Sequence, residues 1–138
     1  MVSWNNLDTL ASFKELANVK PACLTEVMSG DSGADRVKKY SIPMAAGLSY
    51  NYASKQVDED VLSALEKLAD EAQLADKFKA LYNGEVVNTG EKRLVLHHMT
   101  RGQLGDAVEA DGVDKRTFYK TQQERIAEFA NKVHNGEI

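Results

Sequence analysis

Hydrophobic residues near the start of the chain recur at helical spacing. One such set, each member three residues after the last, is Leu7, Leu10, Phe13 and Leu16. The spacing predicts an amphipathic helix of about three turns, for which Asn5 or Asn6 can supply the N-cap. Pro21 then suits the first turn of a second, short helix that ends at Gly30, and residues 29–33 have the composition of a loop.

Between residues 36 and 52 the hydrophobic period changes from helical to two. The residues that share one parity are Tyr40, Ile42, Leu48, Tyr50 and Tyr52, with residues 43–47 between the two groups. This pattern predicts a small β-hairpin. Two strands alone are only marginally stable, so the apolar face of the hairpin must lie against helices or further protein. We expect the tyrosines to be packing residues rather than a sugar-stacking surface.

The longest helical pattern covers residues 58–84. Asp58 can cap a helix, and the acidic residues after it stand where the helix dipole favours negative charge. Two apolar sets follow, namely Leu62, Leu65, Leu68, Ala69 and Ala72, then Leu74, Phe78, Leu81 and Tyr82. The pattern leaves open whether they form one helix or two. The carboxylates of the region are predicted to form a solvated face rather than a metal or acid/base site.

The stretch from residue 88 to residue 101 combines turn residues, an apolar run and two histidines. Asn88 or Thr89 can cap a helix, and Glu91 can return a hydrogen bond to the capping residue. A helix from this cap would carry Arg93, His97 and Arg101 on one face. Residues 94–96 could instead form a short buried strand, because periodicity does not separate the two structures at this length. The cap favours the helix.

The predicted stripe of Arg93, His97 and Arg101 has two interpretations. The two guanidinium groups offer fixed donor forks for an anion or a carboxylate. Such side chains more often bind carboxylates or helix-end carbonyls of neighbouring elements, and structural ion-pair networks of this kind resemble functional sites. We therefore predict that the stripe is structural.

The last part of the chain is predicted to be an exposed, flexible loop followed by a helix. Gly102, Gly105 and Gly112 indicate the loop. Asp114 can cap the final helix, His134 suits its negative end and Gly136 stops it. The broad apolar face of this helix is formed by Phe118, Ile126, Phe129 and Val133.

Composition places the chain among ordinary globular proteins. Its 138 residues are 43% hydrophobic and 28% charged, which predicts one α-rich domain over residues 1–138. The formal charge of -4 argues against nucleic-acid and membrane-surface partners. The single cysteine, Cys23, excludes an internal disulfide, fits a reducing cytoplasm and is expected to be a small core residue. Neither a membrane span of about 18 apolar residues nor a secretory signal is recognisable, so we expect a cytoplasmic protein.

Other candidate chemistry is disfavoured. His97 and His98 are adjacent, so on a helix they point about 100° apart and do not readily bind one metal ion, and His134 is distant in sequence. Cys23 lacks a recognisable activating partner. Residues 29–33 lack the context of a phosphate-binding loop. The sequence therefore predicts no catalytic, cofactor-binding or metal-binding residue.

Three landmarks resemble the N-terminal region of the glucose-6-phosphate isomerase family. The first is Gly84-Glu85, Asn88 and the run from Glu91 to His97, ending in Arg101. The second runs from Tyr52 to Asp60 and is similar to a Tyr-Ser-Lys stretch before an acidic helix start. The third leads from Ile126 to Asn135-Gly136-Glu137 and resembles a long helix that ends in Ser-Gly-Glu. Gly90 and Leu94 depart from the family pattern, which usually has Thr and Ala there.

The resemblance implies a fold that is mainly α with a small β-hairpin (α+β), without the two sugar-isomerase α/β domains. The family interconverts glucose 6-phosphate and fructose 6-phosphate in glycolysis and gluconeogenesis by acid/base chemistry, without metal or redox cofactor. Its phosphate-binding and catalytic groups lie beyond the Ser-Gly-Glu landmark. The resemblance thus implies that this chain is a structural, inactive piece whose partners are the remaining catalytic domains, in a homodimer that binds the sugar phosphate.

Two alternatives come from other functional classes. One is a free-standing helical protein-interaction module that uses the apolar faces of the hairpin and the last helix. The other is a small enzyme built on Arg93, His97 and Arg101, which would need a concave pocket with a nearby base or nucleophile. Reading the gene downstream of Ile138 would discriminate the first alternative from the isomerase.

Overall fold

The computed structural model describes residues 2–102 and 105–138. The chain divides into two compact units, Asn5–Ala72 and a second one that joins Met1–Trp4 to Gln73–Ile138. Helices dominate both, and the strands of the described residues form three separate two-stranded antiparallel sheets. The predicted α-rich class with little β-structure is confirmed, although the hairpins outnumber the one expected. That residues 1–138 form a single domain stays a prediction.

The unit of residues 5–72 begins with a helix that is shorter than predicted. Its elements are η1 (Leu7–Thr9), α1 (Ala11–Asn18), α2 (Leu24–Val27), α3 (Gly30–Lys39), β1 (Ser41–Pro43), η2 (Ala45–Gly47), β2 (Ser49–Asn51) and α4 (Glu59–Glu71). Leu10 is extended (φ -80°, ψ 146°) and separates η1 from α1. The predicted cap is wrong, because the Asn6 side chain makes no capping hydrogen bond.

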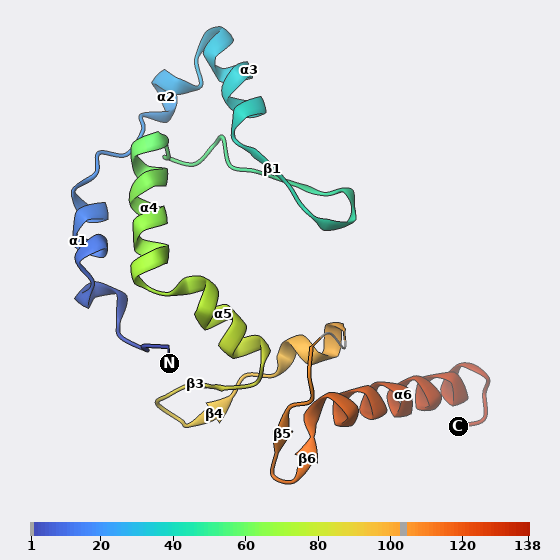
Figure 1. Ribbon diagram of the computed structural model, residues 1–138. Helices are drawn as coiled ribbons and strands as arrows, with labels where there is room; N and C mark the ends of the chain where they lie inside the picture. The colour runs from blue at the N-terminus through green and yellow to red at the C-terminus, as the bar shows by residue number, and fades with distance from the viewer. Residues whose placement is uncertain (1, 103–104) are drawn as a thin grey trace. The chain divides into compact units, whose positions relative to one another are not determined.

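The start of α1 is capped from another helix. The Glu71 carboxylate accepts hydrogen bonds from the backbone N–H groups of Ala11 (3.3 Å) and Ser12 (2.8 Å), and from the Ser12 hydroxyl. The hydroxyl is the main reason that the pKa of Glu71 is lowered from its ordinary value, followed by the backbone bond from Ser12. A carboxylate near a helix N-terminus is favourable, and it fastens the end of α4 to the start of α1, which lies alongside it (Figure 1).

Residues 30–33 belong to α3, so the predicted loop over residues 29–33 is wrong. Ser29 is extended and Asp31 lies in the first turn, where the helix dipole favours it. Gly33 is buried, and a Cβ atom there would stand 2.4 Å from the Met28 carbonyl oxygen. The glycine is therefore a packing requirement of this helix and not a sign of a turn.

The predicted hairpin over residues 36–52 is confirmed for β1 and β2, which place Ile42 opposite Tyr50. Tyr40 is buried and meets the Tyr52 ring edge-on, with centroids 5.2 Å apart. Tyr50 stacks on Tyr52 at 5.9 Å but keeps 50% of its surface exposed. The packing role expected of the tyrosines thus holds for Tyr40, while Tyr50 presents a large apolar surface to solvent.

The long helical pattern is two helices, α4 and α5 (Leu74–Tyr82). Asp58 caps α4 as predicted, since its Oδ1 accepts a hydrogen bond from Val61 N at 3.0 Å. Gln73 has a left-handed conformation (φ 55°) and ends the helical path. This break occurs without glycine or proline, which is why the sequence left it open.

The unit that contains residues 73–138 has a small core between short elements. They are α5, β3 (Val86–Asn88), β4 (Arg93–Leu94), η3 (His97–Arg101), β5 (Glu109–Ala110), β6 (Val113–Asp114) and α6 (Lys115–His134). Leu96, Met99 and Val108 form the buried cluster, with Leu94 and Tyr119 packed against it. None of the described helices has the length and apolar character that a membrane crossing requires.

The predicted helix over residues 88–101 is wrong. Asn88 and Glu91 do pair, with Glu91 N donating to Asn88 Oδ1 and Asn88 Nδ2 donating to Glu91 Oε2, each at 3.2 Å. These bonds close the turn between β3 and β4, which Lys92 completes with a positive φ of 54°. The alternative prediction, a strand over residues 94–96, is correct for Leu94 but not for Val95 and Leu96.

The predicted loop after residue 102 contains a hairpin that the sequence analysis missed, and residues 103–104 of that loop lie outside the described residues. Asp111 (φ 54°) and Gly112 (φ 71°) form its turn, a pairing typical of tight hairpins. The predicted final helix is confirmed. Asp114 accepts hydrogen bonds from the N–H groups of Arg116 (3.1 Å) and Thr117 (3.3 Å) at its start.

Candidate functional site

The residues of the predicted stripe do not share a helical face. Arg93 lies in β4, whereas His97 and Arg101 lie in η3, and all three are exposed. Arg93 Nη1 is 4.0 Å from Glu91 Oε2. His97 and Arg101 line one open hollow of about 580 Å³, and Arg93 lines a different one of about 550 Å³. The prediction that these three residues share one helical face is therefore wrong, while their structural role stays a prediction.

Cysteine and histidine form neither a metal site nor a buried thiol in the described part of the chain. His, Cys, Asp and Glu residues do not gather there in groups of three that could hold a metal ion. Cys23 is exposed, so its prediction as a core residue is wrong. Its sulfur lies 3.1 Å from the Thr25 hydroxyl oxygen, just before the single turn of α2.

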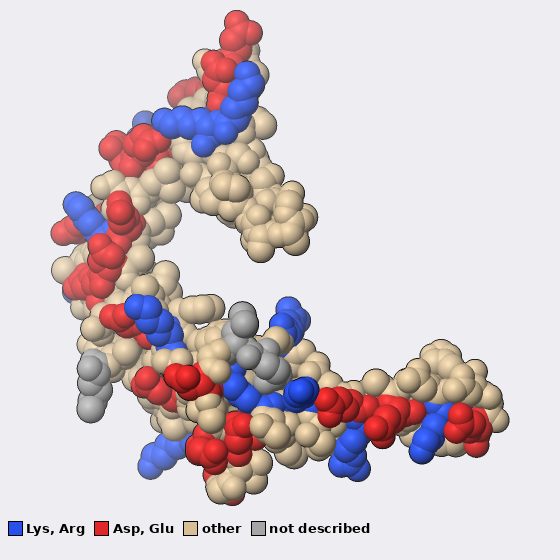
Figure 2. Space-filling model, turned by 45° about the vertical axis from the view of Figure 1, so that its right-hand side comes forward, with Lys and Arg blue, Asp and Glu red and all other residues tan. Residues whose placement is uncertain are grey.

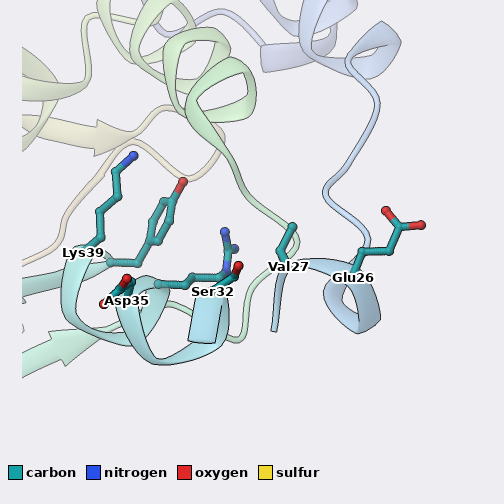
Figure 3. A pocket seen from close by; sticks show the side chains of 7 residues that line it. Glu26, Val27, Ser32, Asp35 and Lys39 are labelled. Atoms are coloured by element: carbon teal, nitrogen blue, oxygen red, sulfur yellow. The ribbon is translucent and has the colours of Figure 1, made fainter. Parts of the chain in front are cut away.

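An open hollow of about 640 Å³ lies against α2 and α3. Figure 3 shows that α2 contributes Glu26 and Val27, while Ser32, Asp35 and Lys39 come from α3. Glu26 and Lys39 extend in different directions in this view. The remaining lining residues are Arg36 and Tyr40, which are buried.

The guanidinium group of Arg36 holds the segment after the β1–β2 hairpin. Its Nε donates to the Ala53 carbonyl oxygen at 2.8 Å, and its Nη2 donates to those of Lys55 (3.0 Å) and Val57 (2.6 Å). The group also lies 4.3 Å from the centre of the Tyr40 ring, within the range of a cation–π interaction. Arg36 is 7% exposed, so its bonds serve the fold rather than a ligand.

Beside the hollow, Lys39 forms an ion pair with Glu59, with 2.8 Å between Nζ and Oε1. This hydrogen bond and the attraction between the charges raise the pKa of Lys39 and lower the pKa of Glu59. The Tyr40 hydroxyl donates to the same carboxylate at 3.3 Å. Both charged side chains are more than half exposed, so solvent screens the pair, and its arrangement gives neither group the shifted pKa of a general acid or base at neutral pH.

A second buried arginine organises the unit of residues 73–138. Arg116 is 6% exposed, and its Nη2 donates to the Tyr82 carbonyl oxygen at 3.0 Å while its Nε donates to that of Asp106. The His98 ring stacks on Tyr82 with centroids 4.8 Å apart and places Nε2 3.2 Å from the same carbonyl oxygen. His98 is thus part of a packed cluster that ties α6 and η3 to the end of α5.

Sequence reasoning missed both arginines. Arg36 was placed at the edge of the hairpin, and Arg116 was not singled out. A signal existed for Arg116, because a positive charge in the first turn of a helix opposes the helix dipole and therefore needs other partners. For Arg36 there was none, since a basic residue in the last turn of a helix is ordinary. What these groups do chemically is hold carbonyl oxygens.

Comparison with known proteins identifies a matching family and several relatives of this chain. A family model described as phosphoglucose isomerase matches residues 51–138. The glucose-6-phosphate isomerase of Treponema denticola is 42% identical over 99% of this chain and 27% of the relative. Those of Borreliella afzelii (41%) and Treponema pallidum (42%) match 100% and 98% of the chain and 26% of the relative each. The chain spans about a quarter of the length of these curated relatives.

Proposed function

The chain belongs to the phosphoglucose isomerase family, and we propose that it is the N-terminal part of an enzyme that interconverts glucose 6-phosphate and fructose 6-phosphate. The observation that carries the proposal is the identity of about 40% over the whole chain to proteins named glucose-6-phosphate isomerase. The role of this part is structural. Two of its buried polar residues, Arg36 and Arg116, fix the backbone, and the catalytic groups belong to the remainder of the enzyme.

Several properties of the whole enzyme belong to the same proposal. It works in the cytoplasm as a homodimer in glycolysis and gluconeogenesis, and it needs neither metal nor redox cofactor. The acidic formal charge of -4 supports a protein without nucleic-acid partners. Residues 1–138 act as one structural domain in this enzyme, and the remaining catalytic domains are its main partner.

The proposal is tested by two samples in one coupled assay. The 138-residue chain alone is expected to show no turnover of fructose 6-phosphate. A chimera in which the chain replaces the aligned N-terminal quarter of the Treponema denticola enzyme is expected to show turnover within about tenfold of that enzyme. Turnover by the isolated chain near that of the full-length relative would refute the structural role, and a folded but inactive chimera would refute membership of the chain in a working isomerase.

A further inference from the structure

The β1–β2 hairpin exposes more apolar surface than a finished protein normally leaves to water. Ile42 and Tyr50 are each 50% exposed, Met44 56% and Leu48 65%. Residues 40–54 include no Asp, Glu, Lys, Arg or His, and Figure 2 shows the hairpin as a lobe without charged side chains. Contiguous exposed patches of this kind mark interaction sites, and two strands alone are only marginally stable. The hairpin therefore indicates a partner.

The apolar surface of the hairpin continues into a groove against α4. The groove has a volume of about 270 Å³ and is open to solvent, and its lining residues other than Lys55 are Ile42, Tyr50, Tyr52, Val57, Leu62 and Leu65. All of them belong to the unit of residues 5–72. Leu65 is 40% exposed although it stands on the apolar side of α4. Hairpin and helix thus present one apolar concavity that this unit does not fill itself.

We infer that this groove, which we call the hairpin groove, docks an apolar segment of the isomerase outside the quarter that this chain spans. The inference rests on the proposed function. The curated relatives extend over about three quarters of their length beyond the match, so a partner of suitable size accompanies this region in them. The lining residues other than Lys55 are uncharged and select an apolar segment, and Lys55 provides one cation for a carboxylate beside it.

Thiol labelling of the chimera described above tests the inference directly. In a Cys23→Ser background, Tyr50→Cys places a thiol in the hairpin groove, and Val37→Cys places one on α3 at similar exposure (44% for Val37) outside it. Labelling is followed by mass spectrometry of the modified peptides. We expect Tyr50→Cys to react at least about tenfold more slowly than Val37→Cys in the chimera, because docking removes it from solvent.

Thermal unfolding supplies the second measurement. Ile42→Asp would place a carboxylate in the docked groove and is expected to lower the Tm of the chimera by at least about 3 °C, whereas Val37→Asp is expected to change it by less than about 1 °C. Equal labelling of the two thiols, together with equal Tm values for the two Asp variants, overturns the docking inference while an active chimera leaves the proposed function intact.

The remaining outcomes are also decisive. A folded chimera that protects Tyr50→Cys but lacks isomerase activity supports docking and overturns the proposed function. A chimera that does not fold contradicts both, because the aligned quarter then cannot replace its relative. Protection of Tyr50→Cys in the isolated 138-residue chain, together with a doubled mass by light scattering, assigns the hairpin groove to a second copy and overturns the inferred occupant.

Discussion

Replacing Arg36 with alanine removes the group that fastens residues 53–57 to α3. In the wild type, the guanidinium nitrogens of Arg36 lie 2.6–3.0 Å from three carbonyl oxygens, which lose this hydrogen-bond donor in the variant. The three belong to Ala53, Lys55 and Val57. Arg36 is 7% exposed, so water replaces the lost bonds only after the segment moves. We therefore expect Arg36→Ala to loosen the connection between the hairpin and α4.

The magnitude follows from the charge of the donor. A hydrogen bond from a charged group contributes about 1.5–3 kcal/mol, and an arginine that is removed also relieves the cost of burying its charge, which is several kcal/mol. The two effects oppose each other, and the loss of the donor for three carbonyl oxygens, at about 1–3 kcal/mol for each one that stays buried, is the larger. We expect Arg36→Ala to reduce the free energy of unfolding by about 2–4 kcal/mol. Arg36→Lys keeps the charge without the planar fork and should lose about half as much.

Urea unfolding of the 138-residue chain, followed by far-UV circular dichroism, measures this loss. Lys38→Ala is the matched control, because Lys38 is in the same helix turn but its side chain is 80% exposed. Trp4 belongs to the other unit and is the single tryptophan, so its fluorescence transition should stay unchanged in Arg36→Ala. A loss below about 0.5 kcal/mol would show that residues 53–57 are held by other contacts and would refute the reasoning.

Three further predictions concern the helix cap Asp114, the buried Gly33 and the thiol of Cys23. The Thr117 hydroxyl and backbone N–H groups lower the folded-state pKa of Asp114 below its ordinary 3.8, so the capping contribution to stability is fully present above pH 3.8 and is lost as the pH falls through the folded pKa. Asp114→Ala should lower the Tm at neutral pH, with the difference from wild type closing below pH 3.8; a constant difference would contradict this. Gly33→Ala should cost about 1–3 kcal/mol in urea unfolding, because the new Cβ would lie 2.4 Å from a backbone oxygen, while Gly90→Ala, whose nearest atom is 3.8 Å away, should stay within about 0.5 kcal/mol. Cys23 should react fully with a thiol reagent in native buffer, since it is exposed; reaction only in denaturant would refute its placement.

The elements that could be predicted from the sequence are those whose determinants are local. Asp58 and Asp114 cap the helices that follow them, as their side-chain chemistry requires. The alternation around Ile42 and Tyr50 correctly predicted the hairpin, although Pro43, expected between the strands, pairs with Ser49 as the last residue of β1. In each case a few neighbouring residues settle the structure, and tertiary contacts agree with them.

The errors have two causes, namely a capping partner that is remote in sequence and a local pattern that fits two different structures. The cap of α1 comes from Glu71, which lies 59 residues from Ser12, and no local pattern contains that information. Asn88 and Glu91 form a capping pattern that serves equally well to close a hairpin turn, so the pair alone did not distinguish a helix start from a β3–β4 connection. The prediction that Arg93, His97 and Arg101 share one helical face was wrong for the same reason, because it depended on an α-helix that runs through all three.

The two buried arginines explain why so much apolar surface remains outside. Apart from Tyr40, Leu96 and Met99, the buried apolar side chains of the described residues are alanines and valines. Arg36 and Arg116 fill interior positions instead and bind backbone carbonyl oxygens, which fixes the path of the chain but buries little apolar area. Large side chains such as Leu48, Ile126 and Phe129 are then left 60–68% exposed. A polypeptide built in this way leaves large apolar side chains free for contacts with further protein, in agreement with the docking inferred for the hairpin groove.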